Sequence, residues 1–474
     1  MGHDLLHGNV LLRGWRMSDV SFYPTELVQY ALLESVLGLH MTTAHVAAAM
    51  TYTLAVLLVV LLARDGTSGQ VALARTLIAG GIMVAPQLSS GVYAVDLAVG
   101  HIGTSVPLLV GWVLVDRAGR RWWVPALMTV ILAWVLVADP VVEITGIAPL
   151  ALVAGLRFAW RLLRERKPDW YHAALACAAV AACTLAWVTQ AGLRALGGYI
   201  VSPLPVHIRT LTQLPAAAPA LWRVLDLFGA DFRGLRPGVP LVLAVAHLLS
   251  VVLVIAALGR CLRRGVSLVD QVLAVGILLN LALYLGTMAS TEGAHEIAVV
   301  LPYAAALAGR VLVPSLPGEK AIRSKAGVKV KVGARPPYAG VRALAGALVL
   351  SCYLAGLGYE LTFPSSPPAN APLASWLAAH GFRSGLAGYW QASSVTVDTG
   401  DQVTVRAVTG SLSPYLWMAD TAWYDPAVST ADFLILQRPS TSELTLLRKR
   451  FGAAAHAYQV DGCTVLTWQR NLLR

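Results

Sequence analysis

About ten apolar stretches, each close to the length that crosses a lipid bilayer, constrain this chain more than any other feature. A membrane-spanning helix needs roughly 20 mostly apolar residues. The candidate stretches are residues 44–63, 72–91, 100–115, 122–138, 141–162, 170–191, 239–258, 268–288, 297–316 and 339–358. The composition agrees, because 57% of the residues are hydrophobic and only 13% are charged, whereas a soluble domain carries about a quarter charged residues. The sequence therefore predicts a polytopic α-helical membrane protein with about ten or eleven spans.

The loops between these stretches alternate in charge, which predicts their orientation. One set carries the basic residues: Arg64 and Arg75; Arg117, Arg120 and Arg121; Arg161, Arg164, Arg166 and Lys167; Arg260, Arg263 and Arg264; and the segment 320–335. The intervening loops 93–99, 139–140 and 289–296 contain no Arg or Lys. Basic loops stay in the cytoplasm. We therefore expect a multi-pass protein of a bacterial plasma membrane, with both ends of the chain outside the cytoplasm.

This orientation divides the chain into three parts. They are an external N-terminal segment (residues 1–43), a transmembrane helical domain (44–358) and an extracytoplasmic domain (359–474). An external first segment is awkward to export without a preceding helix, so a helix upstream of Met1 is expected, although short tails can also cross without one. The net charge of +11 follows from the cytoplasmic loops. No nucleic-acid partner is predicted, because the basic residues are scattered between spans rather than gathered on one face.

Acidic and histidine side chains gather in the loops predicted to lie outside. They are Asp19, Glu26 and Glu34, then Asp96 and His101, then Asp139 and Glu143, and finally Glu292, His295 and Glu296. Ionisable residues at a membrane are costly and therefore suggest function. The sequence predicts a site on the outer face, although the distances between these side chains do not follow from it.

The first external segment is the most informative. Pro24 suits the first turn of a helix and Glu26 suits its N-terminal dipole. Apolar residues then recur at helical spacing, which predicts a short amphipathic helix along the interface. Asp19 lies in the loop just before this helix. It could accept a proton from a hydroxyl group, or it could be a helix-entry cap or a solvated loop acid.

The remaining candidates each have two interpretations. Asp139 directly follows an apolar stretch and precedes Pro140, so it could cap the next helix or share a cavity with Asp19. His101 could contact substrate or be a satisfied interfacial histidine. His295 could contact a phosphate or a sugar hydroxyl. Arg209, in the long segment 192–238, could bind a lipid-linked phosphate or be a solvated loop charge.

After residue 358 the composition changes to that of a small α/β domain. Residues 373–380 and 441–451 are predicted as helices, and 432–437 as a short buried strand. Residues 394–398 and 402–407 alternate and predict one hairpin, and 456–460 and 463–468 predict strands around Asp461-Gly462. The aromatic residues are Tyr389, Trp390, Tyr415, Trp417, Trp423 and Tyr424. They could stack on sugar rings, but core packing is the favoured interpretation.

An acid in the first outer loop, an amphipathic helix after it, many spans and an external α/β domain together resemble the GT-C glycosyltransferases. The stretches 8–15 and 386–392 are similar to integral membrane proteins of high-GC actinobacteria. The resemblance implies a sugar donor linked to polyprenyl phosphate, and a first-loop acid that acts as catalytic base or metal ligand. Only Asp19 fits that position. The cofactor is left open, with a divalent cation as the candidate.

These arguments lead to a membrane glycosyltransferase that transfers a sugar from a polyprenyl-phosphate donor to an extracytoplasmic acceptor. Asp19 would deprotonate the acceptor for an inverting displacement. Asp139 or Glu143 would assist or help to hold a metal, and Arg209 would neutralise the departing phosphate. The substrate-binding candidates are Glu26, His101, Glu143, Arg209, His295 and Glu296.

Two alternatives belong to other classes of protein. A transporter or lipid flippase would place ionisable residues in mid-span, where this chain has little beyond His172 and His247, and its two halves show no evident repeat. A non-catalytic scaffold with an external binding domain would tolerate substitution of the outer acids.

Overall fold

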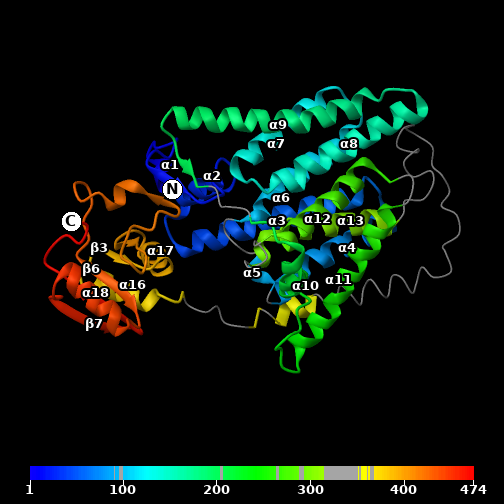
Figure 1. The fold of residues 1–474 in the computed structure, drawn as a ribbon. Coiled ribbons are helices and arrows are strands. Elements are labelled where there is room, and N and C mark those ends of the chain that lie inside the picture. The colour runs from blue at the N-terminus through cyan, green and yellow to red at the C-terminus, as the bar shows by residue number, and fades with distance from the viewer. Residues whose placement is uncertain are drawn as a thin grey trace.

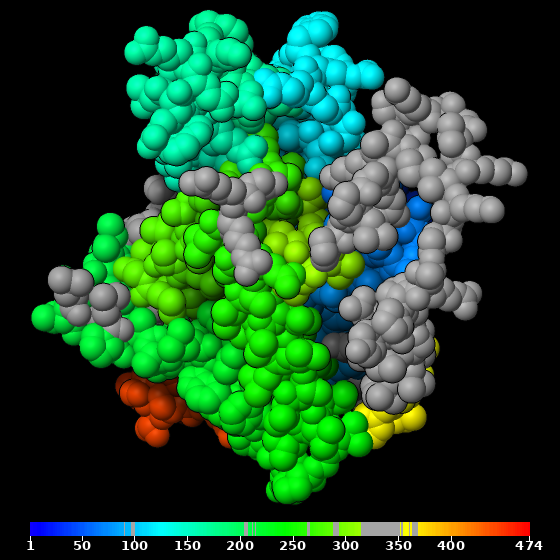
Figure 2. Space-filling view, turned by 90° about the vertical axis from the view of Figure 1, so that its right-hand side faces the viewer, coloured from blue at the N-terminus to red at the C-terminus, as the bar shows by residue number. Residues whose placement is uncertain are grey.

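The computed structural model describes residues 1–89, 91–95, 100–202, 207–262, 266–287, 293–313, 351, 354–359, 361–362 and 368–474. Its helices form a long bundle, and the C-terminal sheet domain lies at one end of that bundle (Figure 1). From the opposite end, the helices α8 and α9 stand at the top of the molecule and little of the C-terminal domain is visible (Figure 2).

Helices occupy nine of the predicted stretches. They are α3 (Met41–Arg64), α4 (Gly69–Val84), α6 (His101–Ala118), α7 (Trp123–Ala138), α8 (Ala148–Trp160), α9 (Trp170–Ala195), α11 (Val239–Cys261), α12 (Leu268–Gly286) and α13 (Val300–Leu312). Within the described ranges, six helical segments are long and apolar enough to cross a membrane, and α7 and α13 are apolar but shorter. The chain is therefore a multi-pass helical membrane protein. The predicted total of ten or eleven spans is not confirmed, and most of the predicted stretch 339–358 lies outside the described residues, as does the basic segment 320–335.

Two of these helices are irregular at their ends. α4 passes into a single 3₁₀ turn, η1 (Ala85–Leu88), where Pro86 removes a backbone donor. α8 is flanked by π-helical turns, η2 (Glu143–Ile147) and η3 (Arg161–Glu165). The shorter elements of the bundle are α5 (Val92–Val95), η4 (Leu211–Ala217), α10 (Ala218–Leu227) and η6 (Ala294–Ile297).

The helix α13 is the most buried element of the bundle. Every residue from 300 to 310 is buried, and α3, α4, α11 and α12 pack around it. Small side chains allow this close approach, as is usual between membrane helices. A Cβ at Gly309 would lie 2.9 Å from the Cβ of Ala63 and 3.0 Å from the carbonyl oxygen of Arg75. This packing fixes the position of η6, which directly precedes α13.

A buried arginine holds together one end of the bundle. The guanidinium of Arg310 lies 2.9 Å and 3.1 Å from the two carboxylate oxygens of Asp116, and its Nε donates to Asp270. It also donates to the carbonyl oxygen of Leu62 at 2.9 Å. These bonds join α3, α6, α12 and α13. Asp116 is near the last residue of α6 and His101 is its first, so this ionic cluster lies at the opposite end of α6 from His101.

The N-terminal segment connects distant parts of the chain. It contains α1 (Gly2–Leu6), β1 (Trp15–Met17) and α2 (Glu26–Leu37), so a helix begins at Glu26, where one was predicted. β1 is the central strand of a small sheet. It pairs in parallel with β2 (Ile200–Val201), which follows α9, and antiparallel with β5 (Ala419–Asp420) of the C-terminal domain. The segment is therefore held from both sides.

The C-terminal domain contains a five-stranded mixed sheet in the order β4-β3-β6-β8-β7. Its strands are β3 (Ser384–Ala387), β4 (Thr404–Ala407), β6 (Phe433–Gln437), β7 (His456–Val460) and β8 (Cys463–Thr467). Helices α16 (Ala371–Ala379) and α17 (Tyr389–Asp398) cover one face, and α18 (Thr441–Phe451) covers the other. A 3₁₀ turn, η7 (Thr421–Tyr424), follows β5.

The predicted hairpin of this domain is wrong. Residues 394–398 belong to α17, and β4 pairs in parallel with β3, a strand that was not predicted. The buried residues Ala392 and Val395 are three positions apart, which fits a helix face, and so short a run is ambiguous between the two periods. The helices near 373–380 and at 441–451 are confirmed, as are the strand near 432–437 and the hairpin around Asp461-Gly462.

Candidate active site

The loop that carries Asp19 lies against the C-terminal end of α7. The backbone N–H groups of Ser21 and Phe22 donate to the carbonyl oxygen of Ala138 at 3.1 Å and 3.0 Å, and the Ser21 hydroxyl donates to that of Val137 at 3.0 Å. The last carbonyl groups of a helix have no partner within the helix. The loop satisfies them, and it thereby brings Asp19 close to Asp139, the residue that follows Ala138.

Asp139 is buried and uses both carboxylate oxygens. Its side chain is 1% exposed. Oδ2 accepts from Nδ1 of His101 at 2.7 Å and from the hydroxyl of Thr104, whereas Oδ1 accepts from the backbone N–H of Val141 at 2.9 Å. Asp139 therefore caps the turn into the next helix and also fixes the orientation of the His101 imidazole. The two interpretations left open for Asp139 are compatible with each other.

His101 joins Asp139 to a second acid, Glu296. Nε2 of His101 lies 3.6 Å from Oε2 of Glu296, and Nε2 of His295 lies 3.3 Å from Oε1 of Glu296. Burial raises the pKa of Glu296, but the hydrogen bonds from His101 and His295 outweigh burial and lower the pKa to about 2. The Glu296 side chain is 31% exposed. It is therefore a permanent negative charge at the accessible side of the cluster.

Asp19 is half-buried and lies within electrostatic range of the same three groups. Burial raises its pKa above the usual value for aspartate, and the negative charges of Glu296 and Asp139 raise it further, while His101 lowers it. A carboxylate with a raised pKa is a stronger base than an exposed one. Asp19, His101, Asp139 and Glu296 thus form one cluster, in which Asp19 has the properties of a proton acceptor.

Glu26 is buried where α2 meets the start of α6. Its Oε1 accepts from the backbone N–H of Gly100 at 3.1 Å, and a Cβ at Gly103 would lie 2.0 Å from that same oxygen. Burial raises the pKa of Glu26 to about 8, against the opposing effect of the Gly100 hydrogen bond. Glu26 is therefore protonated at neutral pH. It joins the two helices rather than presenting a charge to a substrate.

Two other predicted residues contact different parts of the chain. Glu143 is exposed at the start of η2, near Cys183 of α9, and it makes no ion pair with the described members of the cluster. Arg209 is half-buried, and its Nε donates to the carbonyl oxygen of Thr287 at 2.9 Å. This bond and the backbone bond from Arg209 to Gly286 anchor the long segment at the end of α12. Asp96 and Glu292 lie outside the described residues.

Two contributors to the site were missed by the sequence analysis. Thr104 donates to Asp139, and its position three residues after His101 on one helix face was an available signal. Met418, in the C-terminal domain, accepts from the backbone N–H of Ser18 at 3.3 Å. No local pattern in the sequence indicates that contact.

The candidate metal site does not fit the side chains seen here. Among the described residues, no group of three or more His, Cys, Asp or Glu side chains is placed to hold a metal ion. Both oxygens of Asp139 are already used by protein donors, and Glu143 lies apart. The chemistry is therefore derived from the side chains of the cluster alone.

No protein-family model and no curated protein sequence matches the chain. The structure is similar to the crystal structure of ArnT from Cupriavidus metallidurans bound to undecaprenyl phosphate, with a TM-score of 0.53 and 13% sequence identity. The match covers 94% of this chain and 87% of that one. The apo state of the same ArnT matches with a TM-score of 0.39 and 12% identity, which carries no further argument.

The fold is therefore similar to that of ArnT. The resemblance predicted from the sequence agrees with this likeness in fold. At 13% identity the likeness extends to the fold alone.

Proposed function

We propose that this chain is a membrane glycosyltransferase that transfers a sugar from a polyprenyl-phosphate donor to an acceptor outside the cytoplasm. The observation that carries the proposal is the position of Asp19. Asp19 is a half-buried carboxylate with a raised pKa, and it lies beside Asp139, His101 and Glu296. This cluster lies at one end of a helix bundle whose fold is similar to that of ArnT. The C-terminal domain lies at the same end, which is the outer end in the orientation predicted from the loop charges.

The cluster supports a displacement in which Asp19 is the base. Its carboxylate takes the proton of an acceptor hydroxyl, and the hydroxyl oxygen attacks the anomeric carbon of the donor sugar. The bond from that carbon to the phosphate oxygen breaks, and the lipid phosphate leaves with the electron pair. Attack from the face opposite the phosphate inverts the anomeric centre.

The other residues have distinct parts in this proposal. Asp139 holds His101 in one orientation, and His101 in turn holds Glu296. The negative charges of Asp139 and Glu296 keep the pKa of Asp19 high. Arg209 is the candidate cation for the departing phosphate, and His295 is the candidate donor to a sugar hydroxyl or to phosphate. Glu26 fixes the start of α6, and Glu143 is left without a role in the reaction.

The proposal is tested by sugar transfer with the purified protein in detergent. Wild type and Asp19→Asn are compared with a panel of polyprenyl-phosphate sugars and a membrane extract as acceptor. Asp461→Asn is a matched control, because Asn-Gly suits the same tight turn as Asp-Gly. Transfer by wild type and by the control, but not by Asp19→Asn, is expected. Equal transfer by Asp19→Asn would contradict the assignment of the base, and no transfer with any donor would contradict the enzyme class.

A further inference from the structure

The connections of the parallel strands in the C-terminal sheet diverge between β3 and β6. β3 is paired in parallel with β4 on one side and with β6 on the other. The helix after β3, α17, covers one face of the sheet, and the helix after β6, α18, covers the opposite face. Open α/β sheets bind ligands at this point, outside the carboxyl ends of neighbouring strands whose connections diverge. The carboxyl ends of β3 and β6 therefore form the switch point of this sheet.

Neutral polar and aromatic side chains lie at this switch point. Gln391, in the first turn of α17, donates through Nε2 to Oε1 of Gln437 at the end of β6, at 3.0 Å. Trp390 is 73% exposed. Its ring lies 5.2 Å from that of Tyr389, which in turn lies 5.4 Å from the ring of Tyr415. The aromatic rings and the amide pair are thus next to each other at the carboxyl edge of the sheet.

An exposed indole beside two amide groups has the chemistry that recognises a sugar. The indole offers a flat apolar face for the C–H groups of a sugar ring. Each amide provides both a donor and an acceptor for hydroxyl groups. The Gln391–Gln437 pair carries no charge, so it suits a neutral sugar better than a phosphate or a carboxylate.

Other aromatic side chains of this domain are used in packing. Trp423 is covered by the guanidinium of Arg406, 3.9 Å from its ring centre, and the hydroxyl of Tyr424 donates to the carbonyl oxygen of Ala407 at 2.6 Å. Core packing, the favoured interpretation of these residues, holds for these two. Trp390 differs from them because its ring faces solvent.

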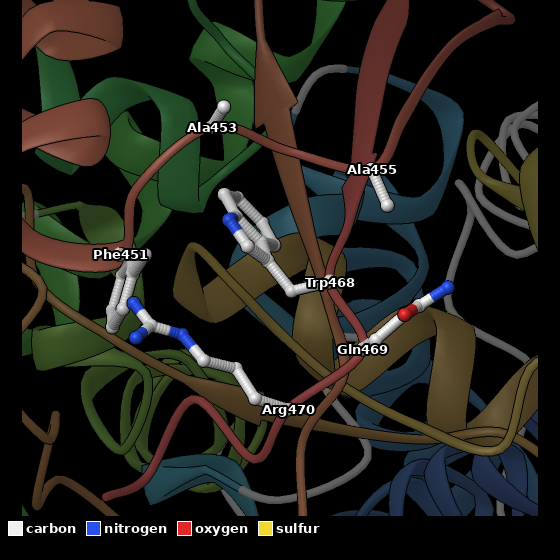
Figure 3. Close-up of a pocket in the computed structure, with 6 residues that line it drawn as sticks. All are labelled: Phe451, Ala453, Ala455, Trp468, Gln469 and Arg470. Carbon is white, nitrogen blue, oxygen red and sulfur yellow. The ribbon is translucent and has the colours of Figure 1, made fainter.

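A hollow of about 390 Å³ elsewhere in this domain does not provide the same chemistry. It is lined by Phe451, Ala453, Ala455, Trp468, Gln469 and Arg470 (Figure 3). Trp468 is only 7% exposed, and its ring packs edge-on against that of Phe451. Trp468 follows β8, which runs antiparallel to β6, so this hollow lies at the opposite edge of the sheet from the switch point.

The switch point belongs to the same domain that is attached to the Asp19 segment. Tyr415 precedes Met418 by three residues, a backbone distance of at most about 11 Å. The sulfur of Met418 accepts from the backbone N–H of Ser18, which directly precedes Asp19. Through the ring contacts of Tyr389 and Tyr415, Trp390 is thus linked to the chain segment that leads to Met418.

We propose that Trp390, Gln391 and Gln437 form a carbohydrate-binding platform that holds a neutral glycan. The use of this platform as the acceptor site rests on the proposed function. The binding of carbohydrate to it is independent of that function. The indole stacks on one sugar ring, and the amide pair bonds to the hydroxyl groups of that ring or of its neighbour. The acceptor class named by this platform is a neutral oligosaccharide or polysaccharide chain.

The platform is tested by calorimetric titration of the full chain in lipid nanodiscs, without any donor. The probes are hexasaccharides of glucose, mannose and galactose, with hexagalacturonate as the anionic comparison. Trp390→Ala and Gln437→Ala are each expected to weaken binding of a neutral probe about tenfold or more. Trp390→Phe, which keeps an aromatic face, is expected to retain most of the affinity. Val428→Ala is the matched control, because Val428 is 71% exposed in the same domain.

The outcomes separate this inference from the proposed function. Wild-type affinity in Trp390→Ala, stronger binding of hexagalacturonate, or no binding of any neutral probe to wild type would overturn the platform, even if sugar transfer is intact. Should Trp390→Ala fail to fold, Trp390→Phe and Gln437→Ala decide between these outcomes. If glycan binding depends on Trp390 but the protein transfers no sugar, the platform is supported and its role as the acceptor site is contradicted.

Discussion

The backbone N–H of Ser18 donates to the sulfur of Met418, which is 3.3 Å away in space and 400 positions further along the chain. Met418 has a φ of 52°, a left-handed conformation that side chains of its size rarely adopt. Its neighbour Ala419 pairs with Arg16 of β1. The C-terminal domain is therefore attached to the peptide that carries Asp19, and the strained backbone at Met418 persists because that attachment holds it.

Met418 contributes no ionisable group to the site. Its attachment to the N-terminal segment nevertheless predicts an effect on the rate of sugar transfer. Met418→Ala removes the acceptor for the Ser18 amide and the apolar contact with the N-terminal segment. Amide exchange in residues 15–25 is expected to accelerate, and the rate of sugar transfer to fall by up to about 100-fold, because small displacements of a reacting group are costly. Leu416→Ala, at a partly exposed position two residues away, is the control. Unchanged exchange in both variants would contradict the attachment.

The buried pair of Asp139 and His101 predicts a loss of rate with little loss of binding. Asp139→Asn keeps the size of the side chain but removes the charge that orients His101. We expect kcat to fall about 100-fold or more, the usual effect of losing an acid–base element. KM for the lipid donor should change little. Steady-state kinetics with varied donor checks both values, and a change confined to KM would show that Asp139 acts only in binding.

The negative charge of Glu296 predicts a shift in the pH profile. Asp19 acts as a base when it is deprotonated, so the rate is lost as the pH falls through its raised pKa. After burial, Glu296 is the group that raises this pKa most. Glu296→Gln removes that charge, and the acid limb of the profile should move to lower pH. The measurement is kcat/KM from pH 4 to 8, and a limb that moved to higher pH would contradict the arrangement.

The ionic cluster at the other end of α6 predicts a loss of stability. Arg310→Ala would leave the carboxylates of Asp116 and Asp270 without the cation that both of them contact. Removing one partner from a buried ionic cluster costs about 3–5 kcal/mol. A clear fall in the apparent melting temperature in detergent is expected. Arg121→Ala, at an exposed position, should melt like wild type, and an equal fall in the two variants would show that the loss of positive charge itself is responsible.

The spans could be predicted from the sequence because their signal is local. An apolar run of 20 residues in a membrane protein has few ways to fold. Strands of four or five residues carry much less information, so β3 was missed and the C-terminal half of α17 was predicted as part of a hairpin. The five-stranded order also depends on parallel pairings between segments separated by helices, which no short pattern encodes.

The residue types of the candidate site and the end of the bundle on which it lies could be predicted from the sequence. The contacts between its side chains could not. His101, Asp139 and Glu296 each lie at the end of a predicted span, so their presence at one membrane face follows from the span boundaries. Which of these residues are in contact depends on the packing of α6, α7 and α13. The sequence alone did not distinguish Asp139 from Glu143 as the residue that would assist the base or help to hold a metal. The burial that protonates Glu26 likewise depends on the contact of α2 with Gly103.

This burial of Glu26 predicts how stability depends on pH. Its pKa is about 8 in the folded chain, compared with an ordinary value of 4.5. The folded state therefore holds this proton more tightly than the unfolded state does. The resulting stabilisation is fully present below about pH 4.5 and is lost progressively as the pH rises toward 8. The wild-type protein should melt at lower temperatures across that range.

Glu26→Gln tests this argument directly, because glutamine has nearly the shape of the protonated acid and keeps an acceptor for the Gly100 N–H. The variant should be more stable than wild type above pH 5, and the difference should grow until about pH 8 and then level off. Thermal unfolding in detergent between pH 5 and pH 9 measures it, with Glu165→Gln at an exposed position as the control. If the difference in stability stayed constant between pH 5 and pH 9, folding would not raise the pKa of Glu26.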